Sequence, residues 1–170
     1  MTGIAEVLQR EIAITTANDR KPILATTNVA MCTAFIGYNE KSKVGFLGHF
    51  DFPGNIKILP TLFKKLKAYS NIPSVYKYWI YGGNKISWAF SPATRRKLHY
   101  CCQSIAPDYG LNFILEKENP YLPLFNKIAF SFDTRNGKFG EYKQRATSLP
   151  LSSLLLRKPV KFVYEGGVNE

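Results

Sequence analysis

Residues 23–53, ILATTNVAMCTAFIGYNEKSKVGFLGHFDFP, decide the fold class. Within them, residues 23–29, 30–38 and 43–51 are apolar runs with β-branched and aromatic side chains, which is typical of strands. The polar run NEKS, at 39–42, separates the second run from the third and predicts a turn. The segment therefore predicts three strands, the last two of which form an antiparallel hairpin.

Downstream, two segments have the apolar spacing i, i+3, i+4, i+7 of an amphipathic helix. Ser91 is the predicted N-cap of the second helix, with Pro92 at its first position. Both apolar stripes need a common sheet face to cover them. The apolar positions are Leu59, Leu62, Phe63 and Leu66 in the first helix, and Leu98, Cys101, Cys102 and Ile105 in the second.

Further strands complete an α/β (α+β) protein, with a mixed, largely antiparallel sheet and two helices. The dipeptide Asn136-Gly137 predicts a hairpin between two of these strands. The length of 170 residues and the absence of a Pro/Gly/Ser-rich linker predict a single domain over residues 1–170. The further strands are predicted at 11–16, 75–81, 111–116, 128–133 and 137–143, with a possible edge strand at 159–165.

Composition and charge limit the possible classes of protein. Hydrophobic residues make up 45% of the chain and aromatic residues 14%, enough for a packed core, so disorder throughout is excluded. No run of eighteen or more apolar residues predicts a membrane span. With 23 Lys and Arg against 12 Asp and Glu, the net charge is +11, which favours partners with acidic surfaces.

The N-terminus and the cysteines indicate a reducing compartment. The first twenty residues do not follow the pattern of a secretory signal peptide, so we expect a cytoplasmic protein, with export by a specialised secretion system as an open alternative. Three cysteines, two of them adjacent at Cys101 and Cys102, do not predict a disulfide framework. His49 and His99 lie far apart and no C-x-x-C is present, so we expect neither a metal nor a cofactor.

The predicted hairpin brings a thiol and an imidazole together. If the turn is centred between Glu40 and Lys41, antiparallel partners have numbers that sum to 81, and Cys32 lies opposite His49. Directly opposed residues have Cβ atoms about 4.5 to 5.5 Å apart. This register predicts a thiolate–imidazolium pair, although a slip of one residue would put the two side chains on opposite faces.

Such a pair can hydrolyse an amide. A free cysteine has a pKa of about 8.5, and a neighbouring imidazole can take its proton. The thiolate of Cys32 would attack a carboxamide carbon, and His49 would protonate the leaving ammonia and then activate water. A third group usually orients the imidazole, and Thr26 could do so through its hydroxyl or its backbone carbonyl. A buried cysteine in a strand is also an ordinary core residue.

The segment resembles the signature region of the chemotaxis receptor glutamine deamidases, the CheD family. In that family a threonine, a short loop, a cysteine-bearing strand, a turn and a histidine-bearing strand follow in this order, and the resemblance extends over about residues 11–143. It implies a three-layer fold related to the catalytic domain of cytotoxic necrotizing factor toxins, and hydrolysis of glutamine side chains in a protein substrate. It also implies that Cys32 is the nucleophile, His49 the general base and acid, and Thr26 the residue that orients His49.

The chain departs from the family pattern in two places. Ala30-Met31 precedes Cys32 where the family usually has Gly-Ser, and residues 149–170 form an extension without a counterpart. The first departure motivates an alternative in which the chain is a catalytically inactive, CheD-like interaction module. If the chain is active, the expected partner is a protein that presents an exposed glutamine, and the net charge favours an acidic segment around it.

A basic nucleic-acid-binding protein is the third alternative. Two clusters of basic residues on the predicted helices could neutralise phosphates, and nearby tyrosines could stack on bases. Solvated helix faces explain the same clusters, and no RNP1 or C2H2 motif is present. The basic residues are Lys57, Lys64, Lys65 and Lys67 in the first cluster, and Arg95, Arg96 and Lys97 in the second.

Overall fold

The computed structural model describes residues 3–71, 73–86, 90–143 and 158–167. In these residues the strands are β1 (Ile4–Val7), β2 (Glu11–Thr16), β3 (Ile23–Val29), β4 (Thr33–Asn39), β5 (Val44–Phe50), β6 (Ser74–Gly82), β7 (Leu111–Glu118), β8 (Ile128–Asp133), β9 (Lys138–Glu141) and β10 (Lys161–Glu165). The helices are α1 (Leu59–Lys67), preceded by a 3-10 turn, and α2 (Ser91–Tyr100), followed by one π turn and one 3-10 turn.

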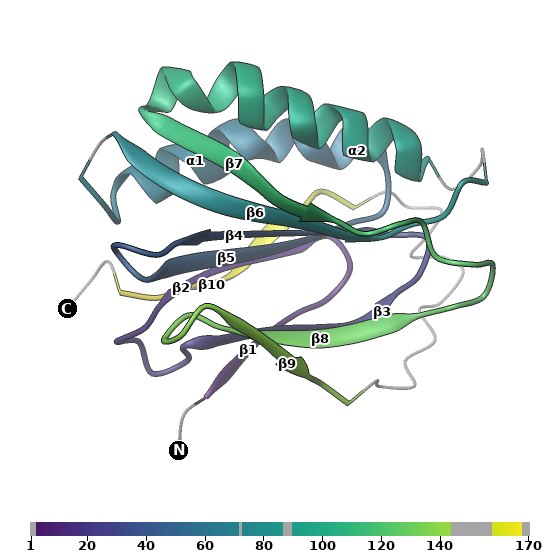
Figure 1. Ribbon diagram of the computed structural model, residues 1–170, viewed down its shortest axis with the longest axis horizontal. Helices are drawn as coiled ribbons and strands as arrows, with labels where there is room; N and C mark the ends of the chain where they lie inside the picture. The colour runs from purple at the N-terminus through teal and green to yellow at the C-terminus, as the bar shows by residue number, and fades with distance from the viewer. Residues whose placement is uncertain (1–2, 72, 87–89, 144–157, 168–170) are drawn as a thin grey trace.

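The strands form two sheets, and the helices add a third layer (Figure 1). The first sheet has the order β10-β2-β5-β4-β6-β7 and the second has the order β1-β3-β8-β9. Both are mixed and largely antiparallel, with parallel pairs at β1–β3, β2–β10 and β6–β7. The predicted α+β class is confirmed, while the division of the strands between two sheets is a feature that the hydrophobic pattern did not specify.

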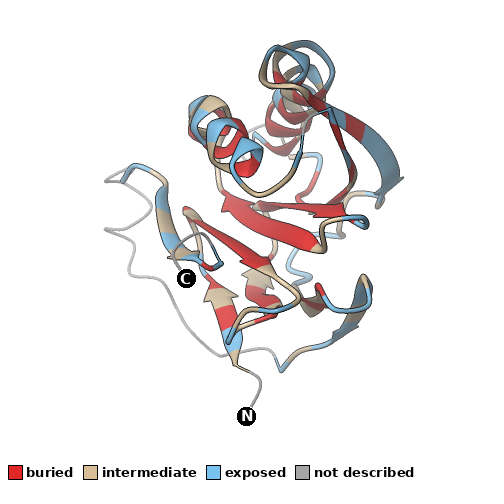
Figure 2. Ribbon diagram, turned by 90° about the vertical axis from the view of Figure 1, so that its left-hand side faces the viewer, coloured by how far each residue is buried: buried red, intermediate tan, exposed pale blue. Residues whose placement is uncertain are grey.

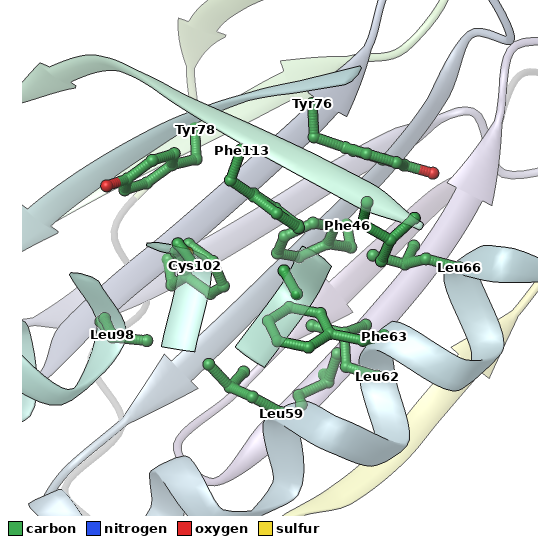
Figure 3. Close-up of a cluster of buried hydrophobic side chains, with 14 of the residues drawn as sticks. Phe46, Leu59, Leu62, Phe63, Leu66, Tyr76, Tyr78, Leu98, Cys102 and Phe113 are labelled. Carbon is green, nitrogen blue, oxygen red and sulfur yellow. The ribbon is translucent and has the colours of Figure 1, made fainter. Parts of the chain in front are cut away.

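Both helices cover the same face of the six-stranded sheet, as their apolar stripes predicted. Figure 3 shows α1 side chains packed with residues of the strands. Phe63 of α1 has its ring centroid 5.3 Å from that of Phe113 on β7, and Leu98 and Cys102 pack on the same cluster. The described helices are too short and too polar for either to cross a bilayer.

A second core lies between the two sheets. Ile36 and Leu47 of the six-stranded sheet pack with Leu24 and Phe132 of the four-stranded sheet. The central strands β4 and β5 are therefore covered on both faces, and every residue in them is buried (Figure 2). Any polar side chain that points from β5 toward β3 is thus enclosed, which sets the environment of the candidate site.

The hairpin register differs from the predicted one by two residues. Asn39 pairs with Val44, so the loop has four residues instead of two, and His49 pairs with Ala34 instead of Cys32. Asn39 explains the longer loop, because its Oδ1 accepts hydrogen bonds from the backbone N–H groups of Lys41, at 3.0 Å, and Ser42, at 3.1 Å.

Two more predictions have clear outcomes. Residues 161–165 form β10 at the edge of the six-stranded sheet, as expected, whereas β1 was not predicted. Ser91 is wrong as an N-cap: Phe90 occupies that position with a left-handed φ of 58°, and Ser91 is the first residue of α2. Of the extension at 149–170, residues 149–157 and 168–170 lie outside the described residues.

Candidate active site

His49 and Thr26 meet between the two sheets. The Thr26 Oγ1 atom lies 3.0 Å from His49 Nδ1 and donates a hydrogen bond of 2.7 Å to the backbone carbonyl of Val7. A hydroxyl has one hydrogen, so the oxygen must accept from Nδ1–H of the imidazole. The hydrogen bonds therefore select the tautomer in which His49 Nε2 has a free lone pair.

Strand register explains this arrangement. β1 and β3 are parallel, with Val7 directly beside Thr26, so the carbonyl that holds the hydroxyl belongs to the neighbouring strand. His49 comes from β5 in the other sheet. Of the two ways in which Thr26 was expected to reach the imidazole, the hydroxyl makes the contact.

Cys32 occupies a bend immediately before β4 and is half-buried. The bend is held through its backbone: Gly83 N–H donates to Ala30 O at 2.8 Å, and Ser91 Oγ donates to Met31 O at 2.7 Å. Gly82 lies against the carbonyl of Cys32, so closely that a Cβ on Gly82 would be 2.7 Å from that oxygen. All three contacts are to backbone oxygens, so the side chains of Ala30 and Met31, where the chain departs from the CheD pattern, take no part in them.

The relation between Cys32 and His49 is less direct than the hairpin argument predicted. The β4–β5 ladder ends at the pair Thr33–Phe50, so Cys32 and Asp51 are the next residue of each strand. His49 Nε2 is buried and, among the described residues, has no hydrogen-bond partner. Cys32 thus sits at the end of the strand pair that carries His49, without a hydrogen bond to it.

Burial disfavours the charged form of both groups. Burial raises the pKa of the Cys32 thiol to about 12, with the charge of Asp51 adding to the rise and that of Arg10 opposing it. Burial lowers the pKa of His49 to about 4, against the opposing effect of Asp51. Both pKa shifts favour a thiol and a neutral imidazole in the resting protein, in place of the expected thiolate–imidazolium pair.

An ion pair beside these residues was missed. Arg10 Nη2 lies 2.5 Å from Asp51 Oδ2, and the two side chains are only 7% and 10% exposed. Gln9 Nε2 donates to the same oxygen at 2.7 Å. The only sequence signal was an acidic residue two positions after His49, because nothing predicted that the turn between β1 and β2 would deliver an arginine there.

The other reactive side chains have structural partners. Cys102 is buried in the helix-side core, in agreement with its prediction as a packing residue. His99 bonds to the Tyr78 hydroxyl at 2.8 Å and to Glu118 at 2.9 Å. Arg95, expected on a basic surface, is instead buried and paired with Glu118 at 3.1 Å, so it does not contribute to that surface.

Metal ligands do not gather at this site. Within the described residues, no group of three or more His, Cys, Asp or Glu side chains could hold a metal ion.

Comparison with known proteins shows only distant likeness. No protein-family model matches the chain, and no curated protein matches it. Among solved structures, the chain is similar to the crystal structure of Neisseria meningitidis protein NMB0706, described by the family-model DUF152. The TM-score is 0.45 and the identity 10%, over 79% of this chain and 71% of that one, which is a weak likeness of fold.

Proposed function

We propose that the chain is a protein-glutamine deamidase, a cysteine-dependent amidohydrolase in which Cys32 is the nucleophile. The Thr26–His49 hydrogen bond is the observation that carries the proposal, because it orients an imidazole with its unprotonated nitrogen free. The order of Thr26, Cys32 and His49 in a segment that resembles the CheD signature supports the same chemistry.

The first half-reaction forms a thioester. As the Cys32 sulfur attacks the carboxamide carbon of a glutamine side chain, His49 Nε2 accepts the thiol proton. The C–N bond of the tetrahedral intermediate then breaks, and the imidazolium gives that proton to the leaving nitrogen, which departs as ammonia. Thr26 keeps Nδ1–H bonded throughout, so that Nε2 is the nitrogen that exchanges the proton.

The second half-reaction restores the cysteine. His49 Nε2 takes a proton from water while the water oxygen attacks the thioester carbon, and the C–S bond breaks. The sulfur recovers the proton, and the glutamine has become glutamate. The balance is one water consumed and one ammonia released.

The neutral resting state is compatible with this sequence. Because burial keeps the pKa of His49 near 4, the imidazole is in its basic form at neutral pH. The thiol stays protonated until a substrate is in place, so the proton must move as the sulfur attacks. Catalytic hydrogen bonds are often long without substrate and tighten in the complex.

The proposed substrate is a partner protein with an exposed glutamine in an acidic segment. A net charge of +11 attracts acidic surfaces over several ångströms, an attraction that salt weakens. The bend at Cys32 lies at one end of the two-sheet core, where the thiol is half-buried. An extended side chain such as glutamine is suited to reach such a thiol.

Peptide mass spectrometry tests the proposal. A cell lysate is incubated with the wild type, with Cys32→Ala and with Cys101→Ala, a matched control that removes another half-buried thiol. We expect conversion of glutamine to glutamate, a gain of about one dalton, with the wild type and the control but not with Cys32→Ala. If no glutamine changes in a Cys32-dependent way, the inactive interaction module becomes the better account.

For nucleic-acid binding, fewer of the expected basic residues are available on the surface. Lys57, Lys64 and Lys67 are exposed on the helical layer, whereas Arg95 is buried. Binding to RNA or DNA that falls steeply between low and moderate salt would support this alternative. A deamidase does not need to bind RNA or DNA.

A further inference from the structure

A buried ion pair, between Arg10 and Asp51, lies next to the candidate site. Oδ2 of Asp51 accepts from Nε of Arg10 at 2.7 Å and from Gln9 at 2.7 Å, and it also contacts Arg10 Nη2. Oδ1 of Asp51 is buried and has no partner among the described residues. Removing two charges from water has a desolvation cost, and an unpaired carboxylate oxygen adds to that cost.

The position of the pair connects it to both candidate catalytic residues. The backbone N–H of Arg10 donates to the carbonyl of His49 at 2.7 Å. Asp51 follows the last residue of β5, level with Cys32 at the end of the β4–β5 ladder. Its backbone N–H is fixed by Asn55 Oδ1 at 2.9 Å. Two opposite charges are thus held at the end of the strand pair where a proton would move.

Arg10 occupies its place at a conformational cost. Its φ is 62°, in the left-handed region, which is unfavourable for a residue with a Cβ. Backbone strain of this kind persists where the surrounding structure fixes it, often next to functional sites. Glycine would remove the strain but also the guanidinium.

We propose that Arg10 and Asp51 are positioning residues for charge separation at the site: Arg10 favours the thiolate form of Cys32, and Asp51 favours the imidazolium form of His49. The inference rests on the proposed function, because the thiolate of Cys32 and the imidazolium of His49 form when the proton passes from sulfur to Nε2. Neither residue exchanges a proton or touches the substrate.

The surrounding charges are consistent with this division. Arg10 lowers the pKa of Cys32 while Asp51 raises it, and Asp51 raises the pKa of His49. Glu11, the cross-strand neighbour of His49 on β2, bonds to the Leu8 N–H at 2.8 Å and lies 3.5 Å from Lys161. On β1, Glu6 accepts a hydrogen bond from Tyr142 at 3.1 Å. On α2, Arg95 donates to the carbonyl of Gly82 and pairs with Glu118.

The rate at which iodoacetamide alkylates Cys32 at pH 8 tests the proposal without any substrate. The rate is read from peptide mass spectrometry and divided by the rate of Cys101 in the same molecules. A change of one pKa unit changes the thiolate fraction about tenfold in this range. We expect Asp51→Asn to react about tenfold faster and Arg10→Gln about tenfold slower than the wild type.

Gln9→Ala is the matched control, because it removes a hydrogen bond to the same Oδ2 without removing a charge. Its Cys32 rate should stay within about twofold of the wild type. Arg10→Lys keeps the charge and should restore most of the rate lost in Arg10→Gln. A loosened structure would expose the thiol and accelerate both single variants, so equal directions of change would overturn the proposal.

Loss of one charge from a buried pair can unfold the protein, so each variant is first checked by circular dichroism. The double variant Arg10→Gln/Asp51→Asn replaces the ions with two amides and should react faster than Arg10→Gln and slower than Asp51→Asn. If one single variant does not fold, the double variant is compared with the single variant that does. A rate equal to that of Arg10→Gln would overturn the role of Asp51 in the thiol pKa, and a rate equal to that of Asp51→Asn would overturn the role of Arg10.

The imidazole is followed separately, by NMR titration of the His49 Cε1 proton. Its pKa should be lower in Asp51→Asn than in the wild type and unchanged in Gln9→Ala; an unchanged value in Asp51→Asn overturns the role of Asp51 toward His49. Opposite thiol shifts without any glutamine conversion would leave this electrostatic role intact and refute the proposed function. Glutamine conversion without the thiol shifts would support the proposed function and refute the electrostatic role of Arg10 and Asp51.

Discussion

Thr26 Oγ1 lies 3.0 Å from Nδ1 of His49, and this contact joins the four-stranded sheet to the six-stranded sheet. Each partner is buried, so neither has water as a substitute. The bond therefore contributes to stability as well as to the orientation of the imidazole, and these two effects can be separated by substitution.

Thr26→Val should lower both stability and activity, because it keeps the side-chain shape but leaves Nδ1–H of His49 without an acceptor. Loss of a partner for a buried donor costs about 1–3 kcal/mol. Urea unfolding measures the loss, and ammonia release measures activity, which should fall less than in Cys32→Ala because Thr26 does not form the covalent intermediate. Thr26→Ser should recover most of both.

Thr27→Val is the control for this prediction. Thr27 is the next residue on β3, also buried, and its hydroxyl has no hydrogen-bond partner among the described residues. Its replacement should leave stability unchanged or raise it. Equal losses in both variants would show that any change on β3 disturbs the core, and the Thr26 hydroxyl would then have no special role.

The buried His49 predicts how stability changes with pH. Its pKa is about 4 in the folded protein and 6.5 when exposed, so the unfolded chain binds the extra proton between these values. Stability should be fully present above pH 6.5 and fall as the pH drops toward 4, by about 3 kcal/mol at 1.36 kcal/mol per pKa unit. Urea unfolding across this range measures it.

His49→Gln isolates this contribution. The amide cannot gain a proton, while His99 and all carboxylates are unchanged, so the difference between the two curves belongs to His49. We expect the variant to lose much less stability from pH 6.5 to 4. Parallel curves would mean that His49 is protonated as easily in the folded protein as in the unfolded one.

The apolar patterns predicted the elements of the fold because each pattern reflects a local period. The stripe from Leu59 to Leu66 is buried as expected, and residues 161–165 form an edge strand. The partition into two sheets was beyond such patterns, since β4 and β5 are buried on both faces and their residues do not alternate in exposure.

The candidate site was predicted only in part, because the sequence does not fix the length of a turn or the conformation of a single residue within it. Thr26 and His49 were named from their order in the chain, and they are in contact. The register of Cys32 against His49 was wrong, because Asn39 extended the turn by two residues. Arg10 could not be foreseen, since its place depends on a left-handed residue in the turn before β2. The catalytic role of the three named residues stays a prediction.

Gly82→Ala should disturb the bend that holds Cys32. Gly82 has a φ of 82°, and a Cβ there would lie 2.3 Å from Val29 Cγ1 and 2.7 Å from Cys32 O. The left-handed conformation alone costs about 1–2 kcal/mol, and the backbone oxygen cannot rotate away. We expect urea unfolding to show lower stability, and we expect the rate of ammonia release to fall more strongly than stability does.

Gly140→Ala, on the mostly exposed strand β9, is a suitable comparison, because among the described residues a Cβ there would meet the Ser131 hydroxyl alone, at 2.9 Å. A side-chain hydroxyl can turn away, so the substitution should have little effect. If Gly82→Ala behaves in the same way, the close approach of β6 to the Cys32 bend is not needed for the fold or for activity.

The reactivity of the cysteines gives the last prediction. A resting thiolate–imidazolium pair would make Cys32 the fastest thiol to alkylate, as the sequence suggested. The structure predicts the opposite: burial raises the pKa of Cys32 to about 12, whereas at Cys101 the charge of Lys97 opposes the rise in pKa that burial causes. At pH 7, iodoacetamide should therefore modify Cys101 before Cys32, and Cys102, buried in the helix-side core, last. Peptide mass spectrometry over time gives the order, and a Cys32 that reacts first and slows in His49→Gln would establish a resting ion pair instead.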